Sequence, residues 1–179
     1  VLNDEINAAR EVTKTDALRL QTFQTRGYGV LGVVDSDRVV YYRDVVKRHT
    51  NKSEFDVTAI QALPRVDVVM VYQGASGDLI KALVDQGAKG IVIASAGAGA
   101  TSGTQSEGIR YAVDKGVVIV TSTRAGAGRI ASRRGGTTPV PGTDADDVPQ
   151  GSPTVSGRRR IAAEDLAPLK ARILLMLAL

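Results

Sequence analysis

Two short runs rich in β-branched and aromatic residues stand in the first third of the chain, at Val30 to Val34 and Arg38 to Arg43. They flank the polar triplet Asp35-Ser36-Asp37, and this pattern predicts a β-hairpin. The next stretch, Arg43 to Pro64, is polar, with KRHTNKSEFD at its centre. We interpret it as a connection that crosses the protein surface.

After Pro64 the pattern changes to short, almost continuously apolar runs that alternate with stretches of helical spacing. The predicted strands are Val66 to Tyr72, Gly90 to Ala94 and Val117 to Thr121, and the predicted helices are Gly77 to Gln86 and Ser106 to Lys115. Gly87 is expected to end the first helix. Buried-type strands that alternate with helices indicate parallel βαβ units, so the predicted fold class is α/β, with a parallel sheet flanked by helices.

The segment from Ala125 to Arg160 interrupts this pattern, because it is rich in Gly, Pro, Ser, Thr and Asp and has almost no large apolar residues. Such a composition predicts a long mobile loop. Helical spacing returns in AAEDLAPLKARILLMLAL, where Asp165 is the expected N-cap and Pro168 lies in the first turn. The predicted buried stripe of this helix consists of Leu169, Ile173, Leu174 and Leu177.

Composition narrows the chemistry that the chain can support. There is no cysteine and the only histidine is His49, which excludes disulfides, zinc–cysteine sites and a multi-histidine metal site within one chain. No apolar run reaches the length of a membrane span. The net charge of +4 is mild and local, in the clusters Arg129 with Arg133 and Arg134, and Arg158 to Arg160. These clusters lack interleaved aromatic residues, so we expect a solvated role rather than nucleic-acid binding.

The glycine-rich sequence SAGAGATSG, Ser95 to Gly103, follows a predicted strand and precedes a predicted helix. Its glycines would allow a ligand to approach the backbone, but the dinucleotide fingerprint is incomplete because Ser102 occupies the sixth position. Three interpretations remain open at this point. The segment is a plain tight turn, a nucleotide site, or a site for a small carboxylate or amine that uses the hydroxyls of Thr101 and Ser102.

A second candidate is Thr13-Lys14-Thr15, in which a lysine lies between two hydroxyl groups. A lysine in this position can hold a threonine ready for deprotonation, or act as a base if burial lowers its pKa. An isolated lysine is more often a solvated surface residue. The residues alone leave both interpretations open.

Taken together, several blocks of the sequence resemble the bacterial type II L-asparaginases. They occur in the family's order and cover nearly the whole chain except Ala125 to Arg160. The blocks read VLNDEI, VTKTDA, TFQTRGYGVLG, RHTNKSEFDV, LPRVDVV, GAKGIVIASAGAG, KGVVIVTSTR and KARILLMLAL. The resemblance implies a threonine acyl-enzyme that hydrolyses the side-chain amide of asparagine, and in some members glutamine. No cofactor and no metal are expected.

The resemblance also implies an organisation. Residues 1–43 would form the end of a large N-terminal α/β domain, residues 44–64 a linker, and residues 65–179 a smaller C-terminal α/β domain that contains the long loop 125–160. The family assembles as a homotetramer of intimate dimers with active sites shared between subunits. It favours a periplasmic or secreted location, with a cytoplasmic one left open.

Site residues follow from the same resemblance. Lys14 falls on the lysine of the family's Thr-Lys-Asp group, which tunes a threonine hydroxyl and relays protons. The residue after the second threonine is Asp16 here, where the family has an asparagine. Ala100 stands where relatives carry Asn or Ser, at a position that reaches into the neighbouring subunit's active site, and Thr101 is the candidate replacement. The family's acidic residue after the STR block has no clear counterpart, and its candidates are Asp144, Asp146 and Asp147.

The family's two threonine-bearing blocks, of the TGGTI and HGTDT types, do not occur within the 179 residues. We therefore expect the chain to be a fragment of such an enzyme and to be inactive by itself. The alternative from another class is a non-catalytic α/β module that binds a nucleotide or small ligand through the Gly97–Gly99 loop.

Overall fold

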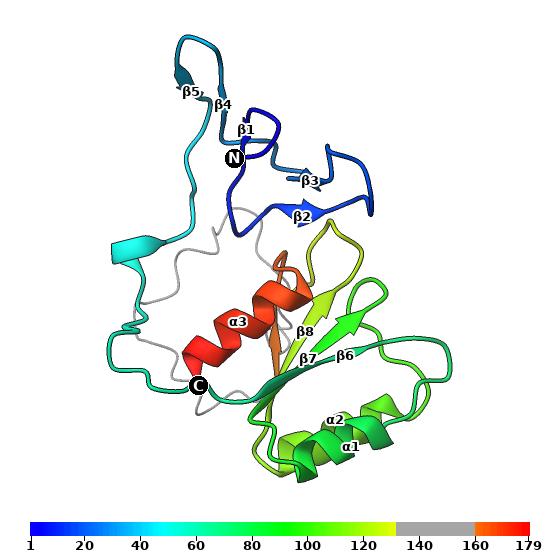
Figure 1. Cartoon of the computed structure of the whole chain (residues 1–179). Coiled ribbons are helices and arrows are strands. Elements are labelled where there is room, and N and C mark those ends of the chain that lie inside the picture. The colour runs from blue at the N-terminus through cyan, green and yellow to red at the C-terminus, as the bar shows by residue number, and fades with distance from the viewer. Residues whose placement is uncertain (132–159) are drawn as a thin grey trace, which may run out of the picture.

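The computed structural model describes residues 1–131 and 160–179, and its centre is a four-stranded parallel sheet in the order β6-β7-β8-β9 (Figure 1). The strands are β6 (Val66–Met70), β7 (Gly90–Ser95), β8 (Val118–Thr123) and β9 (Arg160–Ala162). Each neighbouring pair is parallel in register. The β6, β7 and β8 strands confirm the prediction. The β9 strand was not predicted, because a three-residue strand at the end of a polar segment gives no apolar pattern to detect.

Helices cover both faces of this sheet. α1 (Asp78–Asp85) and α2 (Gln105–Asp114) lie on one face and α3 (Pro168–Ala178) lies on the other (Figure 1). On the α1–α2 face, Ile91, Ile93 and Ile119 pack in a buried cluster with residues of both helices. The α3 face has its own cluster, in which Val92 and Val120 contact Ala171 and Leu175. The predicted α/β class, with a parallel sheet between helices, is confirmed.

The predicted burial of α3 is wrong. Leu169 is 72% exposed, Ile173 is 48% exposed and Leu174 is 41% exposed, while Ala171 and Leu175 are buried. Leu177 is half-buried. Residues spaced by four lie on one side of a helix, whereas Leu169 is two positions from Ala171 and therefore points away from the sheet. The apolar residues of α3 extend around the helix, so spacing alone did not identify the side that packs.

The predicted cap of α3 is also wrong. The residue at its N-cap position is Ala167, which makes no side-chain capping hydrogen bond, and Pro168 is the first residue of the helix. Asp165 lies two residues earlier and uses its carboxylate elsewhere, as described below. A proline is well tolerated at the first helical position, because the N–H it lacks would have no partner within the helix and its ring fixes φ near the helical value.

The N-terminal part of the chain contains two small antiparallel sheets. One has the order β1-β4-β5 and the other pairs β2 with β3, and the strands are β1 (Glu5–Ile6), β2 (Thr13–Lys14), β3 (Phe23–Gln24), β4 (Gly32–Val34) and β5 (Val39–Tyr41). The β4–β5 pair confirms the predicted hairpin. The polar connection that follows contains one 3-10 turn, η1 (Thr50–Lys52).

The segment predicted to be a mobile loop is only partly described. Residues 125–131 form the connection after β8, whereas residues 132–159 lie outside the described part of the chain. The three candidate acidic residues, Asp144, Asp146 and Asp147, fall in that range, so their placement stays a prediction. Among the described helices, none is both long and apolar enough to cross a bilayer.

Candidate functional site

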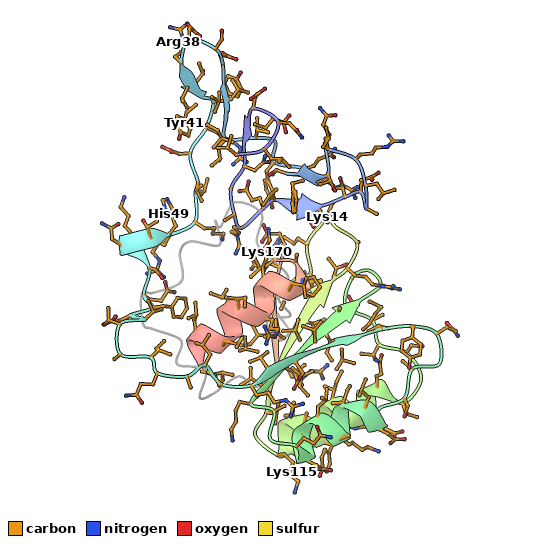
Figure 2. All side chains as sticks on the ribbon, in the orientation of Figure 1. Lys14, Arg38, Tyr41, His49, Lys115 and Lys170 are labelled. Carbon is orange, nitrogen blue, oxygen red and sulfur yellow. The ribbon has the colours of Figure 1, made fainter. Side chains whose placement is uncertain are left out.

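Lys14 lies on β2, where it pairs directly with Phe23 on β3. Its side chain is exposed, and Nζ lies 5.5 Å from the centroid of the Phe23 ring (Figure 2). A cation over the face of an aromatic ring is attracted by the ring quadrupole. The hairpin therefore presents the ammonium at its surface.

The turn that joins β2 to β3 is built from the hydroxyl and carboxylate groups around Lys14. The Thr15 hydroxyl donates to the Thr22 carbonyl over 2.9 Å, so it is committed to the hairpin. Asp16 accepts hydrogen bonds from the backbone N–H groups of Arg19 at 2.9 Å and Leu18 at 2.8 Å. Those two bonds lower the pKa of Asp16. An asparagine oxygen could accept the same bonds, so Asp16 adds a charge to the turn without requiring a different shape.

The glycine-rich loop after β7 is a tight turn whose polar groups are partly committed to the fold. Gly99 has φ = +97°, a conformation that favours glycine. The Ser102 hydroxyl accepts a hydrogen bond from the Gly74 N–H at 3.0 Å, and the Ser102 N–H donates to Gln105 Oε1 at 3.3 Å. Ala100 and Thr101 are exposed. Of the two hydroxyls considered for ligand binding, only that of Thr101 has no structural partner among the described residues.

A cavity of about 280 Å³ lies where the N-terminal segment meets the C-terminal α/β unit. Arg10, Thr13 and Tyr28 line it from one side, and Thr123 and Asp165 from the other. Neither Lys14 nor the Ala100–Thr101 pair is among its lining residues, so the predicted site residues do not meet in this cavity.

Asp165 connects the two sides of the cavity, a role that the sequence analysis missed. Arg10 Nη2 donates to Asp165 Oδ1 at 2.7 Å, and the Tyr28 hydroxyl donates to Asp165 Oδ2 at 2.8 Å. Burial opposes ionisation of Asp165, but the Tyr28 hydrogen bond and the Arg10 guanidinium outweigh it and hold the pKa of Asp165 below its ordinary value. These partners are 155 and 137 residues away in sequence, so no local pattern could have indicated them.

Lys170 makes a second connection, also missed. It lies on α3, and its Nζ donates to the carbonyl oxygen of Val12, the residue before β2 (Figure 2). Burial lowers the pKa of Lys170, the nearby Arg10 lowers it further, and Glu11 opposes the change. Lys170 on α3 therefore holds Val12, the residue directly before the strand that carries Lys14.

Comparison with known proteins gives matches along the whole chain. The family model Glutaminase/Asparaginase C-terminal domain matches residues 65–179, and the model Asparaginase, N-terminal matches residues 1–47. L-asparaginase 2 of Bacillus subtilis strain 168 is 37% identical over 100% of this chain and 42% of its own length. Glutaminase-asparaginase of Pseudomonas fluorescens biotype A is 33% identical over 99% of this chain and 44% of its own length.

A solved structure gives the same result for the fold. The structure described as a probable cytoplasmic L-asparaginase from Campylobacter jejuni superposes with a TM-score of 0.81 and is 36% identical, and the match covers 99% of this chain and 49% of that one. The chain therefore spans less than half the length of these relatives. Because the C-terminal family model alone matches residues 65–179 of the 179, the chain belongs to the glutaminase/asparaginase family.

Proposed function

We propose that this chain is the lysine-bearing part of an L-asparaginase, which hydrolyses L-asparagine to L-aspartate and ammonia. The observation that carries the proposal is Lys14, whose ammonium is exposed on a hairpin with ordered turn geometry. The relative named L-asparaginase supports asparagine as the substrate, and the one named glutaminase-asparaginase makes glutamine a second candidate. No comparison supports the alternative of a nucleotide-binding module.

The proposed reaction passes through a threonine acyl-enzyme. A threonine oxygen, supplied by a block outside these 179 residues, attacks the amide carbon while its proton passes into the relay of groups that includes Lys14. Ammonia departs with a proton returned from the same relay, and water then hydrolyses the ester to free the threonine. A point charge on a flexible stem suits this task, because Nζ can follow the proton without moving the backbone.

The Ala100–Thr101 pair is the proposed substrate-binding contribution to a neighbouring subunit. Both residues are exposed at the carboxyl end of β7, where a partner's substrate could reach them. The loops beyond the carboxyl ends of parallel strands are the usual ligand-binding edge of an α/β sheet. This assignment requires an assembly, and the proposed one is a homotetramer of intimate dimers with shared active sites.

The proposed domain division places residues 1–43 in the N-terminal domain, 44–64 in a linker and 65–179 in the C-terminal domain. The change from small antiparallel sheets to a parallel sheet between helices supports it. The proposed location is the periplasm or the exterior, on the family resemblance, although the Campylobacter jejuni relative is described as cytoplasmic. Fractionation of cells that express an enzyme of full family length would decide between them.

Ammonia release tests the proposed function. An enzyme of full family length that contains this chain should release ammonia from asparagine, and the 179-residue chain alone should release none above background. Sedimentation of the same enzyme tests the tetramer. An active isolated chain whose activity is abolished by Lys14→Met would overturn the need for an external threonine. A full-length enzyme that releases no ammonia from either amide would overturn the function itself.

A further inference from the structure

The carboxylate of Asp165 holds the chain on both sides of the Lys14 hairpin. Arg10, which donates to Oδ1 at 2.7 Å, precedes β2, and Tyr28, which donates to Oδ2 at 2.8 Å, follows β3. One side chain of the C-terminal α/β unit therefore fixes both stems of the β2–β3 pair. Arg10 and Asp165 are mostly shielded from solvent, with side-chain exposures of 27% and 19%.

The support beneath Asp165 leads into the centre of the parallel sheet. The Ala163 N–H donates to the Thr121 carbonyl at 2.8 Å. The Ser122 hydroxyl donates to the Leu166 carbonyl at 2.6 Å. The residues flanking Asp165 are thus bonded to β8 on both sides. Ser122 is itself buried, and its carbonyl accepts from the Ser95 hydroxyl at 2.8 Å, which ties β8 to β7.

Lys170 contributes an independent contact from the first turns of α3. Its Nζ donates to the Val12 carbonyl, adjacent to Thr13 at the start of β2. The short β2–β3 pair has only two residues in each strand. A two-residue hairpin is marginal by itself in water. The contacts with the C-terminal unit therefore add to the hydrogen bonds of the hairpin's own turn in fixing its position.

We infer that Asp165 and Lys170 are positioning residues for Lys14, holding its hairpin against the end of β8 and the start of α3. This inference rests on the proposed function for the role of Lys14 in turnover, but the contact itself is a property of the 179-residue chain. Positioning matters because displacing a reacting group by about 1 Å can cost about 10²-fold in rate.

The chain offers a matched control for Asp165. The Tyr111 hydroxyl donates to Asp85 Oδ1 at 2.6 Å, which is the same tyrosine–aspartate chemistry between α1 and α2. Asp85→Asn removes the charge from that pair and keeps an acceptor for Tyr111, so it controls for the loss of an aspartate charge away from the hairpin. Tyr28→Phe is a milder companion to Asp165→Ala, because it removes only one of the two bonds on the carboxylate.

Hydrogen exchange of the Thr15 amide, which donates to the Thr22 carbonyl, measures the hairpin directly. In the 179-residue chain, Asp165→Ala should speed this exchange about tenfold or more, and Tyr28→Phe should do so less. The β7 amides should keep their protection in both variants, which shows that the fold survives, and Asp85→Asn should leave Thr15 unchanged. Thr15 exchange that stays at the wild-type rate in Asp165→Ala overturns the inference.

Turnover in an enzyme of full family length separates positioning from general destabilisation. Asp165→Ala should lower kcat by about tenfold to 10²-fold with KM nearly unchanged. In a Lys14→Met background the same substitution should lower kcat no further, because the group it positions is already gone. A loss that is equally large in both backgrounds overturns the inference. Full turnover in Lys14→Met would instead overturn the proposed role of Lys14, while the exchange experiment still reports on the contact.

Discussion

Lys14 and Phe23 are direct partners across the β2–β3 pair, and the Lys14 ammonium lies 5.5 Å from the centroid of the Phe23 ring. An exposed cation–π contact of this kind contributes about 0.5–1 kcal/mol. The hairpin therefore loses little stability if Lys14 is replaced. Stability and turnover can be separated at this position, which gives the first prediction.

Lys14→Met in an enzyme of full family length should lower kcat by about 10²- to 10⁴-fold, the usual effect of removing a proton-transfer group. The free energy of unfolding should change by no more than about 1 kcal/mol, since the side chain is exposed. Lys115→Met is a matched control, because Lys115 Nζ lies 5.6 Å from the centroid of the Tyr111 ring, at the end of α2 (Figure 2). Ammonia assays and chemical denaturation measure the two effects. Near-wild-type kcat in Lys14→Met would return this lysine to the surface-charge interpretation.

Ala100→Ser and Ala100→Asn test the proposed contact with a neighbouring active site. Each restores a polar group at an exposed loop position, so each should lower KM or change the preference between asparagine and glutamine, with stability unaffected. A hydrogen bond to a charged substrate group contributes about 1.5–3 kcal/mol at most, which sets an upper limit of roughly 10²-fold on the change. Steady-state kinetics with both amides provide the measurement. Unchanged kinetics would show that this loop does not reach substrate, or that Thr101 already supplies the contact.

Local patterns predicted the elements whose own residues repeat the period of a strand or a helix. The runs of β6, β7 and β8 were recognisable because these strands carry buried apolar residues on both faces of the sheet, and α1 and α2 because each packs an apolar stripe on it. Gly87, with φ = +90° directly after α1, also acts locally. The fold class followed from this alternation of strands and helices.

The features that the sequence did not indicate depend on residues far away along the chain. Asp165 is of a residue type that commonly caps helices and lies just before α3, yet Arg10 and Tyr28 use its carboxylate from the other end of the chain. The side of α3 that packs was also undetermined, because the helix is apolar almost all around. Lys14 was already a candidate from the residues alone, but only the resemblance favoured a functional role, since a lysine between two threonines has no pattern that separates it from a surface residue.

Gly108→Ala should destabilise the C-terminal unit, because α1 and α2 approach closely at this glycine. An added Cβ would lie 2.5 Å from the Gly77 carbonyl oxygen and 2.9 Å from Ile80 Cβ, and a backbone atom cannot rotate away. Overpacking of this kind costs about 1–3 kcal/mol. Gly97→Ala is the control, since a Cβ there meets nothing within 4 Å. Urea denaturation of the 179-residue chain should show a lower midpoint for Gly108→Ala alone, and equal midpoints would mean that the two helices separate at little cost.

Asp165 should make stability depend on pH on the acidic side. Its folded pKa is below the ordinary value of 3.8, so the stabilisation is complete above that value and is lost as the pH falls through the folded pKa. Asp165→Asn removes this titration, so the difference in unfolding free energy between wild type and variant should shrink as the pH falls below about 4. Denaturation curves between neutral pH and about pH 3 measure it. A difference that stays constant over this range would show that the ionised carboxylate contributes nothing through Arg10 and Tyr28.

Lys170 should act on the alkaline side, with the opposite direction of titration. Burial lowers its folded pKa below the ordinary 10.5, so between these two values the unfolded chain binds more protons than the folded one. The free energy of unfolding contributed by this residue therefore rises as the pH increases through that window. The Tyr28 phenol has the reverse effect. Its hydrogen bond to Asp165 raises its folded pKa above the ordinary 10.0, so the free energy of unfolding falls as the pH rises from 10.0 toward the folded pKa.

A difference measurement separates these two contributions. Lys170→Met should remove the rise and leave the fall due to Tyr28, so wild type should gain stability relative to the variant as the pH approaches about 10. Lys81→Met is the control for the loss of a surface lysine from a helix, because Lys81 pairs with Asp78 at 3.2 Å on the surface of α1. Urea denaturation from pH 7 to about pH 10 provides the measurement. Parallel profiles for wild type and Lys170→Met would show that burial does not lower the pKa of Lys170 in solution.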